Sequence, residues 1–303
     1  MKHKITITII ILCMFLLTQF VGLYIIASDS VPTFLSSANT DSQSAGYYFY
    51  QLISSFIIAI LIVVLITKYK LRLVMKTWFL IVVIIAISIS LAAILRNIFG
   101  VTNYLFPLIL AIIFGILKLL RPSVVIHNVT EVLIYPGIAT IFVPILTPLY
   151  AILLLILISI YDMWAVWHSG IMQKMAKFQM NELKIFGGFL IPYIPQEMKN
   201  KIKLLKQKYK NKQIPDKEMK KKKIKIQMAI LGGGDVVFPI ITAGVFMLSV
   251  GLDYAFAVIL GALLGLTLLM SFSEKKKFYP AMPFITAGIF AGLIICWLIN
   301  LIL

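Results

Sequence analysis

Charged residues are scarce in this chain. Of its 303 residues only 13% are Asp, Glu, Lys or Arg, whereas 61% are hydrophobic and the mean hydropathy is +1.01. Soluble domains usually carry about 25% charged residues, so the composition excludes a soluble globular protein. It predicts an all-α polytopic membrane protein in which each spanning helix takes about 20 apolar residues.

Cysteine and histidine are also rare, and this excludes several kinds of site. The two cysteines, Cys13 and Cys296, form no CxxC motif and no disulfide framework. The sequence has no HExxH motif for zinc and no GxSxG motif for a serine nucleophile. His127 and Glu131 are spaced to share one helical face, where we expect a polar contact rather than metal ligation. We predict no metal and no organic cofactor.

Long apolar segments dominate what is present. Nine can be marked, and we predict a spanning helix for each: 5–26, 48–67, 78–97, 103–120, 124–144, 149–168, 226–250, 253–271 and 280–302. The first is longer than the 7–15 apolar residues of a signal peptide, so we interpret it as a spanning helix.

The basic residues are distributed unevenly along these segments. If the N-terminus is cytoplasmic, all of the 28 basic residues except Arg96 fall at the cytoplasmic side. This follows the positive-inside rule and predicts nine helices with a cytoplasmic N-terminus and an extracellular C-terminus, in a multi-pass protein of the cell membrane. The net charge of +17 therefore reflects topology, and we expect no nucleic-acid partner.

One long hydrophilic segment divides the chain. Residues 170–225 are rich in lysine and predict a basic cytoplasmic loop, for which binding of anionic lipid headgroups is the alternative. The loop separates a six-helix bundle, residues 1–169, from a three-helix unit, residues 226–303. We see no inverted repeat of the kind that many transporters contain.

Three of the 11 acidic residues, Glu131, Asp162 and Asp235, lie within apolar segments. With the sixth helix running inward and the seventh outward, Asp162 and Asp235 fall roughly 9 and 14 Å from the cytoplasmic ends of their helices. We therefore expect both acids at similar depth on antiparallel helices.

The stretch LGGGDVVFP places Asp235 where it is costly. A carboxylate at the centre of a membrane helix costs about 2.5–3.5 kcal/mol, and a glycine about 1 kcal/mol relative to alanine. Pro239 removes the hydrogen bond that the carbonyl of Asp235 would otherwise accept. A helix weakened on both sides of one acid indicates a functional site.

Two facing carboxylates in an apolar site cannot both ionise easily, so such a pair holds a shared proton. One member can then activate a water while the other donates a hydrogen bond to a carbonyl oxygen. This chemistry predicts an aspartyl protease. A proton- or ion-coupled transporter using the same acids, or buried acids with a structural role, are the alternatives that the residues leave open.

Three short motifs bear on this choice. Tyr161-Asp162, Gly232-Gly233-Gly234-Asp235 and Pro280-Ala281-Met282-Pro283 occur in this order at the sixth, seventh and ninth segments. Together they resemble the YD, GxGD and PAL motifs of the presenilin and signal peptide peptidase family of intramembrane aspartyl proteases, and most of all its archaeal members. Met282 replaces the leucine of PAL, which is an apolar change of similar volume. Prepilin peptidases share GxGD but lack the other two motifs.

The resemblance implies a function and a set of site residues. The chain would hydrolyse peptide bonds within transmembrane proteins or signal peptides in the bilayer, by a two-aspartate, water-activating mechanism. Asp162 and Asp235 would be catalytic, and Tyr161, Gly232, Gly234, Pro280, Ala281, Met282 and Pro283 would support them. The sequence does not predict an oligomeric state.

Overall fold

The computed structural model describes residues 5–28, 42–69, 71–120, 123–169, 187–193, 227–272 and 279–302. Its longer helices are α1 (Ile5–Ala27), α3 (Ser42–Lys68), α4 (Arg72–Phe99), α5 (Leu105–Leu120), α6 (Val124–Phe142), α7 (Pro148–Trp164), α11 (Gly233–Ser249), α12 (Leu252–Phe272) and α13 (Met282–Ile302). Short 3-10 and π segments, Val143–Ile145 and Ala165–Ser169, end α6 and α7. Strands β1 (Gly188–Tyr193) and β2 (Gln227–Gly232) form an antiparallel pair.

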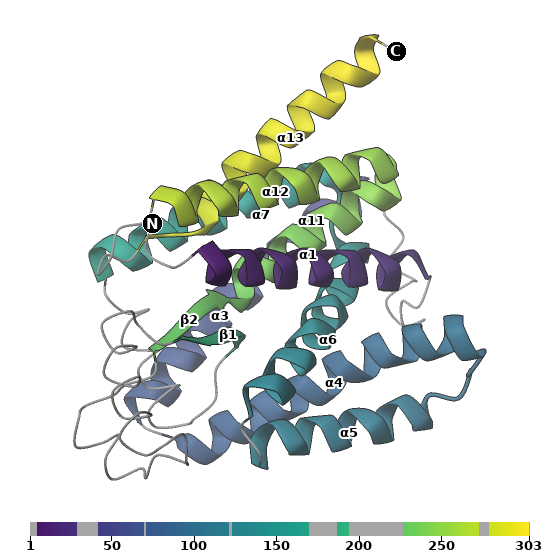
Figure 1. The fold of residues 1–303 in the computed structure, drawn as a ribbon, viewed down its shortest axis with the longest axis vertical. Coiled ribbons are helices and arrows are strands. Elements are labelled where there is room, and N and C mark those ends of the chain that lie inside the picture. Colours follow the sequence, from purple (N-terminus) through teal and green to yellow (C-terminus); the bar gives the residue numbers. More distant parts are fainter. Residues whose placement is uncertain are drawn as a thin grey trace, which may run out of the picture.

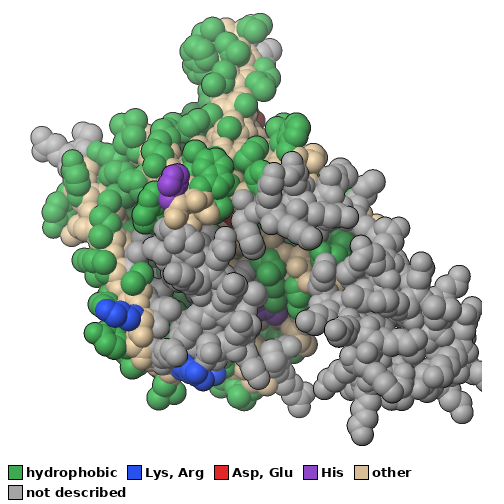
Figure 2. All heavy atoms as spheres, turned by 90° about the vertical axis from the view of Figure 1, so that its left-hand side faces the viewer, with side chains coloured by type: hydrophobic (Ala, Val, Ile, Leu, Met, Phe, Trp, Pro, Cys, Tyr) green, Lys and Arg blue, Asp and Glu red, His purple; other side chains and the backbone are tan. Residues whose placement is uncertain are grey.

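Seven of the helices among the described residues are long and apolar enough to cross a membrane, and α5 and α11 are shorter apolar helices. Many large apolar side chains on these helices are exposed, including Leu264 on α12 and Ile302 on α13. Figure 2 shows hydrophobic side chains over most of the described surface of one face. Helices that are apolar on all sides are typical of membrane spans, so the polytopic membrane prediction is confirmed.

Helix α11 lies at the centre of the bundle. It packs against α1, α6, α7 and α12, and an unbroken run of its side chains from Pro239 to Phe246 is buried. In Figure 1, α4 and α5 run alongside each other on one side of this centre, and α12 and α13 lie on the other. The residues at the beginning of α11 are therefore enclosed by helices from both halves of the chain.

The fold is mostly helical, as predicted, with one two-stranded sheet among its helices. The prediction of one helix from residue 226 is wrong, because the first part of that segment is strand β2 and α11 begins at Gly233. The run Gly232 to Gly234 explains the change, since glycine weakens a helix and favours a break in it. Pairing with β1 then satisfies the backbone groups that the missing helical turns would have used.

The strand that pairs with β2 lies in a segment for which no strand was predicted. β1 lies within residues 170–225, which the sequence predicted as a basic loop. The remainder of that segment, with its lysine runs, is outside the described residues. Alternate side chains of the pair, Phe189 and Ile191 on β1 and Ala229 and Leu231 on β2, are buried in the core. The sheet is therefore fixed to the bundle beneath the start of α11.

Candidate active site

Asp162 lies near the end of α7 and is buried, with 8% of its surface exposed. Its Oδ2 accepts a hydrogen bond from the backbone N–H of Met282 at 3.1 Å, and the backbone of Ala281 also interacts with this carboxylate. Met282 is the first residue of α13 and Ala281 directly precedes it, where the N–H groups have no helical partner. The carboxylate satisfies them and lies at the positive end of the helix dipole.

This contact gives the Pro280–Pro283 motif a structural meaning. Proline has no N–H, so Pro280 and Pro283 leave the amides of Ala281 and Met282 as the donors at the start of α13. Pro280 and Met282 are buried. The sequence predicted that this motif lies beside the site, and the structure places its backbone in direct contact with Asp162.

Asp235 is the third residue of α11 and follows the end of β2 almost directly. Its carboxylate interacts with the backbone N–H of Gly232, the residue that precedes the helix, as the acid of a capping box does. A Cβ atom at Gly232 would lie 3.0 Å from Oδ2 of Asp235. Glycine at position 232 therefore leaves room for the carboxylate to fold back over the helix start.

The structure brings the two predicted acids near each other. Helices α7 and α11 pack against each other, and Asp162 and Asp235 are near enough to interact electrostatically. Each carboxylate is also held by backbone N–H groups of a helix N-terminus. A pair of this kind, in an apolar bundle, can share one proton and so offer one acid and one base.

Two other predicted site residues, Gly234 and Tyr161, have different surroundings. Gly234 belongs to the same turn as Asp235, but a Cβ there would only meet the ring of Phe238 at 3.6 Å, an ordinary contact. Tyr161 is 41% exposed, and its ring packs near that of Trp164 with the centroids 6.4 Å apart. Its ring thus lies at the surface of α7 while the neighbouring Asp162 points inward.

Glu131, the third acid within an apolar segment, pairs with a lysine and not with the two aspartates. It is 1% exposed, and its Oε1 lies 2.6 Å from Nζ of Lys118 in a buried ion pair. Lys118 is one of the basic residues that the charge pattern assigns to the cytoplasmic side, and its side chain is buried against α6 rather than exposed. Within the described residues there is no group of three His, Cys, Asp or Glu side chains that could hold a metal.

Tyr135 lies beside this pair and was not predicted from the sequence. It is 3% exposed on α6, and its hydroxyl interacts electrostatically with Asp235 and with Glu131. A Cβ atom at Gly233 would lie 2.9 Å from both Cε1 and the hydroxyl oxygen of Tyr135. The sequence feature that could have identified Tyr135 is its spacing of one helical turn from Glu131, which places both side chains on one face of α6.

This contact predicts that the middle glycine of the GGGD stretch cannot be replaced freely. In Gly233→Val the added side chain would displace Tyr135 or the first turn of α11, and we expect about a tenfold loss of activity. Tyr135→Ala in the same chain removes the obstructing ring and should recover part of that loss. The measurement is a double-mutant cycle on the cleavage rate, with Gly234→Val as the control for valine in this turn. Equal losses with and without Tyr135 would contradict the steric explanation.

Comparisons with known proteins show which family the chain resembles. The model of the family described as "Signal-peptide peptidase, presenilin aspartyl protease" matches residues 10–302. The chain belongs to this family. Two solved structures of a presenilin family intramembrane aspartate protease, in the C222 and P2 space groups, are 16% and 17% identical to it with TM-scores of 0.61 and 0.56. They cover 96% and 95% of this chain, which covers 99% and 96% of theirs. No curated protein matches the chain significantly.

Family membership decides the function class that the residues alone left open. The chain is an intramembrane aspartyl protease, and the prediction made from the three motifs is confirmed. The transporter alternative has no support. The similarity of the folds extends over nearly the whole chain, including both halves that contribute an aspartate.

Proposed function

We propose that Asp162 and Asp235 are the catalytic pair of this protease. The observation that carries the proposal is their juxtaposition on α7 and α11, each carboxylate held by backbone N–H groups at a helix start. These are the only two aspartates on the described parts of those helices. Tyr161, Gly232, Gly234 and the Pro280–Pro283 motif support the pair by shaping the turns around it.

The chemistry follows from a shared proton. The ionised aspartate removes a proton from a water, which attacks the carbonyl carbon of the scissile peptide bond. The protonated aspartate donates a hydrogen bond to the carbonyl oxygen and stabilises the tetrahedral intermediate. Collapse of this intermediate breaks the C–N bond, and the leaving nitrogen takes up a proton from the pair. The Met282 N–H keeps Asp162 in one orientation throughout.

The substrates we propose are transmembrane segments of proteins and remnants of signal peptides. The peptide bonds of a membrane helix are hydrogen-bonded within the helix, so cleavage requires local unwinding. Strand β2 leads into Asp235, and the edge that it turns away from β1 offers backbone groups with which an unwound segment can pair. Side chains of an extended substrate would then alternate between the sheet and the surrounding helices.

The membrane arrangement that fits this function has nine spans. In this arrangement the seven helices that are long and apolar enough would cross the bilayer. Helix α5 would span about 24 Å at 1.5 Å per residue, and α11 is extended by β2. We propose a cytoplasmic N-terminus and an extracellular C-terminus in the cell membrane, because the basic residues then face the cytoplasm. Residues 1–169 and 226–303 each contribute one aspartate, and residues 170–225 connect them.

A reconstituted cleavage assay tests the function. Purified protein in liposomes should cut a single-span reporter within its apolar segment, and a peptide carrying a hydroxyl group in place of the scissile bond should inhibit it competitively. Mass spectrometry of the products locates the cut. Cleavage only outside the apolar segment, or cleavage insensitive to the hydroxyl-containing peptide, would contradict the proposal.

A further inference from the structure

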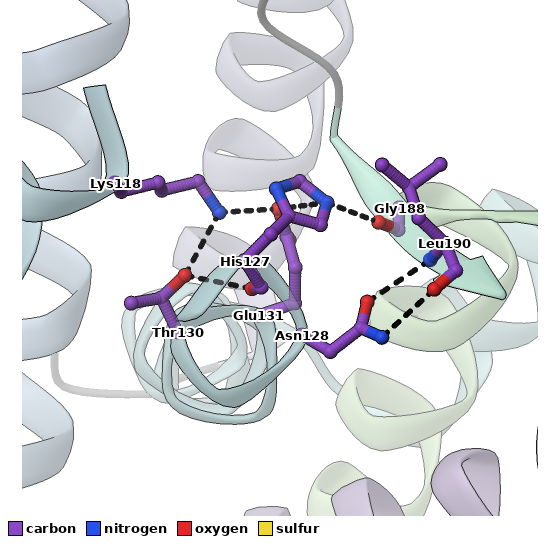
Figure 3. A network of polar contacts seen from close by, with 7 residues as sticks. All are labelled: Lys118, His127, Asn128, Thr130, Glu131, Gly188 and Leu190. Atoms are coloured by element: carbon purple, nitrogen blue, oxygen red, sulfur yellow. Dashed lines mark hydrogen bonds and ion pairs between the residues drawn. The ribbon is translucent and has the colours of Figure 1, made fainter. Parts of the chain in front are cut away.

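The outer edge of strand β1 is hydrogen-bonded to side chains of α6 (Figure 3). Asn128 binds Leu190 twice, with its Nδ2 donating to the carbonyl oxygen at 2.9 Å and its Oδ1 accepting from the N–H at 3.0 Å. The Nε2 of His127 lies 2.7 Å from the carbonyl oxygen of Gly188. Because a carbonyl only accepts, Nε2 carries the proton in this contact.

These hydrogen bonds engage the backbone groups of β1 that do not pair with β2. In an antiparallel ladder the N–H and C=O of one residue point to the same side, and alternate residues point to opposite sides. The backbone N–H and C=O groups of Gly188 and Leu190 point to α6, so those of Phe189 and Ile191 point to their partners on β2. Asn128 thus imitates a third strand, and β1 is bound along both edges.

The position of β1 determines the position of Asp235. β2 ends at Gly232 and α11 begins at Gly233, with no connecting residue between them. The N–H of Gly233 donates to the carbonyl oxygen of Gly187 at 3.3 Å, which extends the ladder by one bond into the helix start. Asp235 follows two residues later, and its carboxylate interacts with Gly232. A displacement of β1 would therefore be transmitted to the carboxylate.

The residues that bind β1 are themselves fixed by a buried ion pair. Nζ of Lys118 lies 2.6 Å from Oε1 of Glu131 and 3.0 Å from the hydroxyl oxygen of Thr130. Thr130 in turn donates to the carbonyl oxygen of His127 at 2.7 Å. Oε1 of Glu131 also lies 3.5 Å from Nε2 of His127. The buried charges are paired, and their hydrogen bonds define one arrangement of this turn of α6.

We propose that His127 and Asn128, held by Lys118 and Glu131, are positioning residues for Asp235. They act through the strand pair, by fixing β1 at its outer edge and so the point at which α11 begins. This inference rests on the proposed function of Asp235. It gives the buried polar cluster of α5 and α6 a role in catalysis, although none of its side chains contacts the two aspartates through a hydrogen bond among the described residues.

The first test removes the paired hydrogen bonds. In Asn128→Ala we expect kcat to fall about tenfold with KM changed less than twofold, because the altered group positions an acid without touching substrate. Asn103→Ala is the matched control, since Asn103 makes a single 2.9 Å side-chain bond at the exposed start of α5. Hydrogen exchange should become faster both in residues 188–193 and in residues 227–235.

A second pair of variants keeps the test decisive if Asn128→Ala does not fold. His127→Leu loses the bond to Gly188, whereas the amide of His127→Gln can place a donor near the position of Nε2. We expect His127→Gln to retain most of the activity and His127→Leu to lose about tenfold. A thermal unfolding midpoint for each variant separates this effect from a general loss of stability.

The outcomes distinguish this inference from the proposed function. Unchanged kcat in the folded Asn128 and His127 variants, with faster exchange confined to residues 188–193, would overturn the positioning role while leaving the catalytic pair intact. An inactive wild type that does not bind the hydroxyl-containing peptide would overturn the proposed function and with it the catalytic part of this inference. Coupled exchange of the two strands together with a kcat effect supports both.

Discussion

Asp162→Asn and Asp235→Asn should each reduce cleavage by at least about a thousandfold. Asparagine keeps the size of the side chain but cannot take a proton from water or share one with the other acid, and acid–base groups contribute about 10²–10⁴-fold each. The double variant should be no slower than either single variant, because the two carboxylates act as one unit. The measurement is the initial rate of reporter cleavage in liposomes.

The structure suggests a control for each aspartate. Asp162 and Asp235 both interact with backbone N–H groups of a helix start, so either could be a capping acid alone. Asparagine still accepts a hydrogen bond from such an N–H, which preserves much of the capping contact. Loss of cleavage with little change in thermal stability therefore indicates catalysis. Asp253→Asn, at the first turn of α12, changes an acid at a comparable helix position outside the site.

A folded Asp235→Asn variant with full activity would exclude the pair. A variant that loses both cleavage and stability would instead show that the carboxylate is required to cap α11. In that case Asp235→Glu gives the answer, since it restores the charge at the helix start but moves the carboxylate by one methylene group. Recovery of stability without recovery of cleavage again assigns Asp235 to the chemistry.

The sequence predicted the helices well because their signal is local. Apolar runs of sufficient length identify membrane spans independently of tertiary contacts, and acids within those runs are conspicuous because they are costly. Asp162 and Asp235 were found in this way, and the alternation of helix direction predicted a similar depth for them. The prediction of an acid pair needed no information on how the helices pack.

The strand pair could not be predicted in the same way. MAILG in β2 continues an apolar run, and short apolar runs do not distinguish strand from helix. Its partner GFLIPY lies in a segment dominated by lysine, more than thirty residues earlier in the chain. Non-local pairing of this kind, and the contacts of Tyr135 and Asn128 that depend on it, become visible only once the chain is folded.

The partners of Lys118 and Glu131 illustrate the same limit. Counting charges by loop assigned Lys118 to the cytoplasmic side, which needed only its position along the chain. Its burial against α6 depends on the way α5 returns beside that helix. A lysine and an acid that lie in neighbouring segments can pair or face solvent, and only the packing decides between these outcomes.

The packing of α13 against α12 should be as critical to activity as the aspartates. A Cβ atom at Gly261 or Gly288 would collide with the carbonyl oxygen of the other glycine. A Cβ atom at Gly265 would collide with the carbonyl oxygen of Phe284. The sequence spacing Gly261–Gly265 and Gly288–Gly292 is the small-residue pattern that allows membrane helices to approach closely. The backbones of the two helices are thus in direct contact.

This contact connects to the site through the start of α13. Met282 donates to Asp162, and one turn later the hydroxyl of Thr286 lies 2.8 Å from that of Ser159 on α7. Gly288 follows two residues after Thr286 on the same helix. A side chain at position 288 must push α13 away from α12. This displacement would disturb both hydrogen bonds from α13 to α7, the one from Met282 to Asp162 and the one between Thr286 and Ser159.

We therefore expect Gly288→Leu to lower the thermal unfolding midpoint strongly and to reduce cleavage to background. Overpacking usually costs about 1–3 kcal/mol, and a collision with a rigid backbone leaves no side chain to move aside. Ala287→Leu is the matched control, because it adds the same side chain at an exposed neighbouring position on α13. Gly288→Ala should fall between them, because it adds the colliding Cβ atom but no more. If Gly288→Leu retained the stability and cleavage rate of Ala287→Leu, the close contact of α12 and α13 would not be what holds the Met282 amide against Asp162.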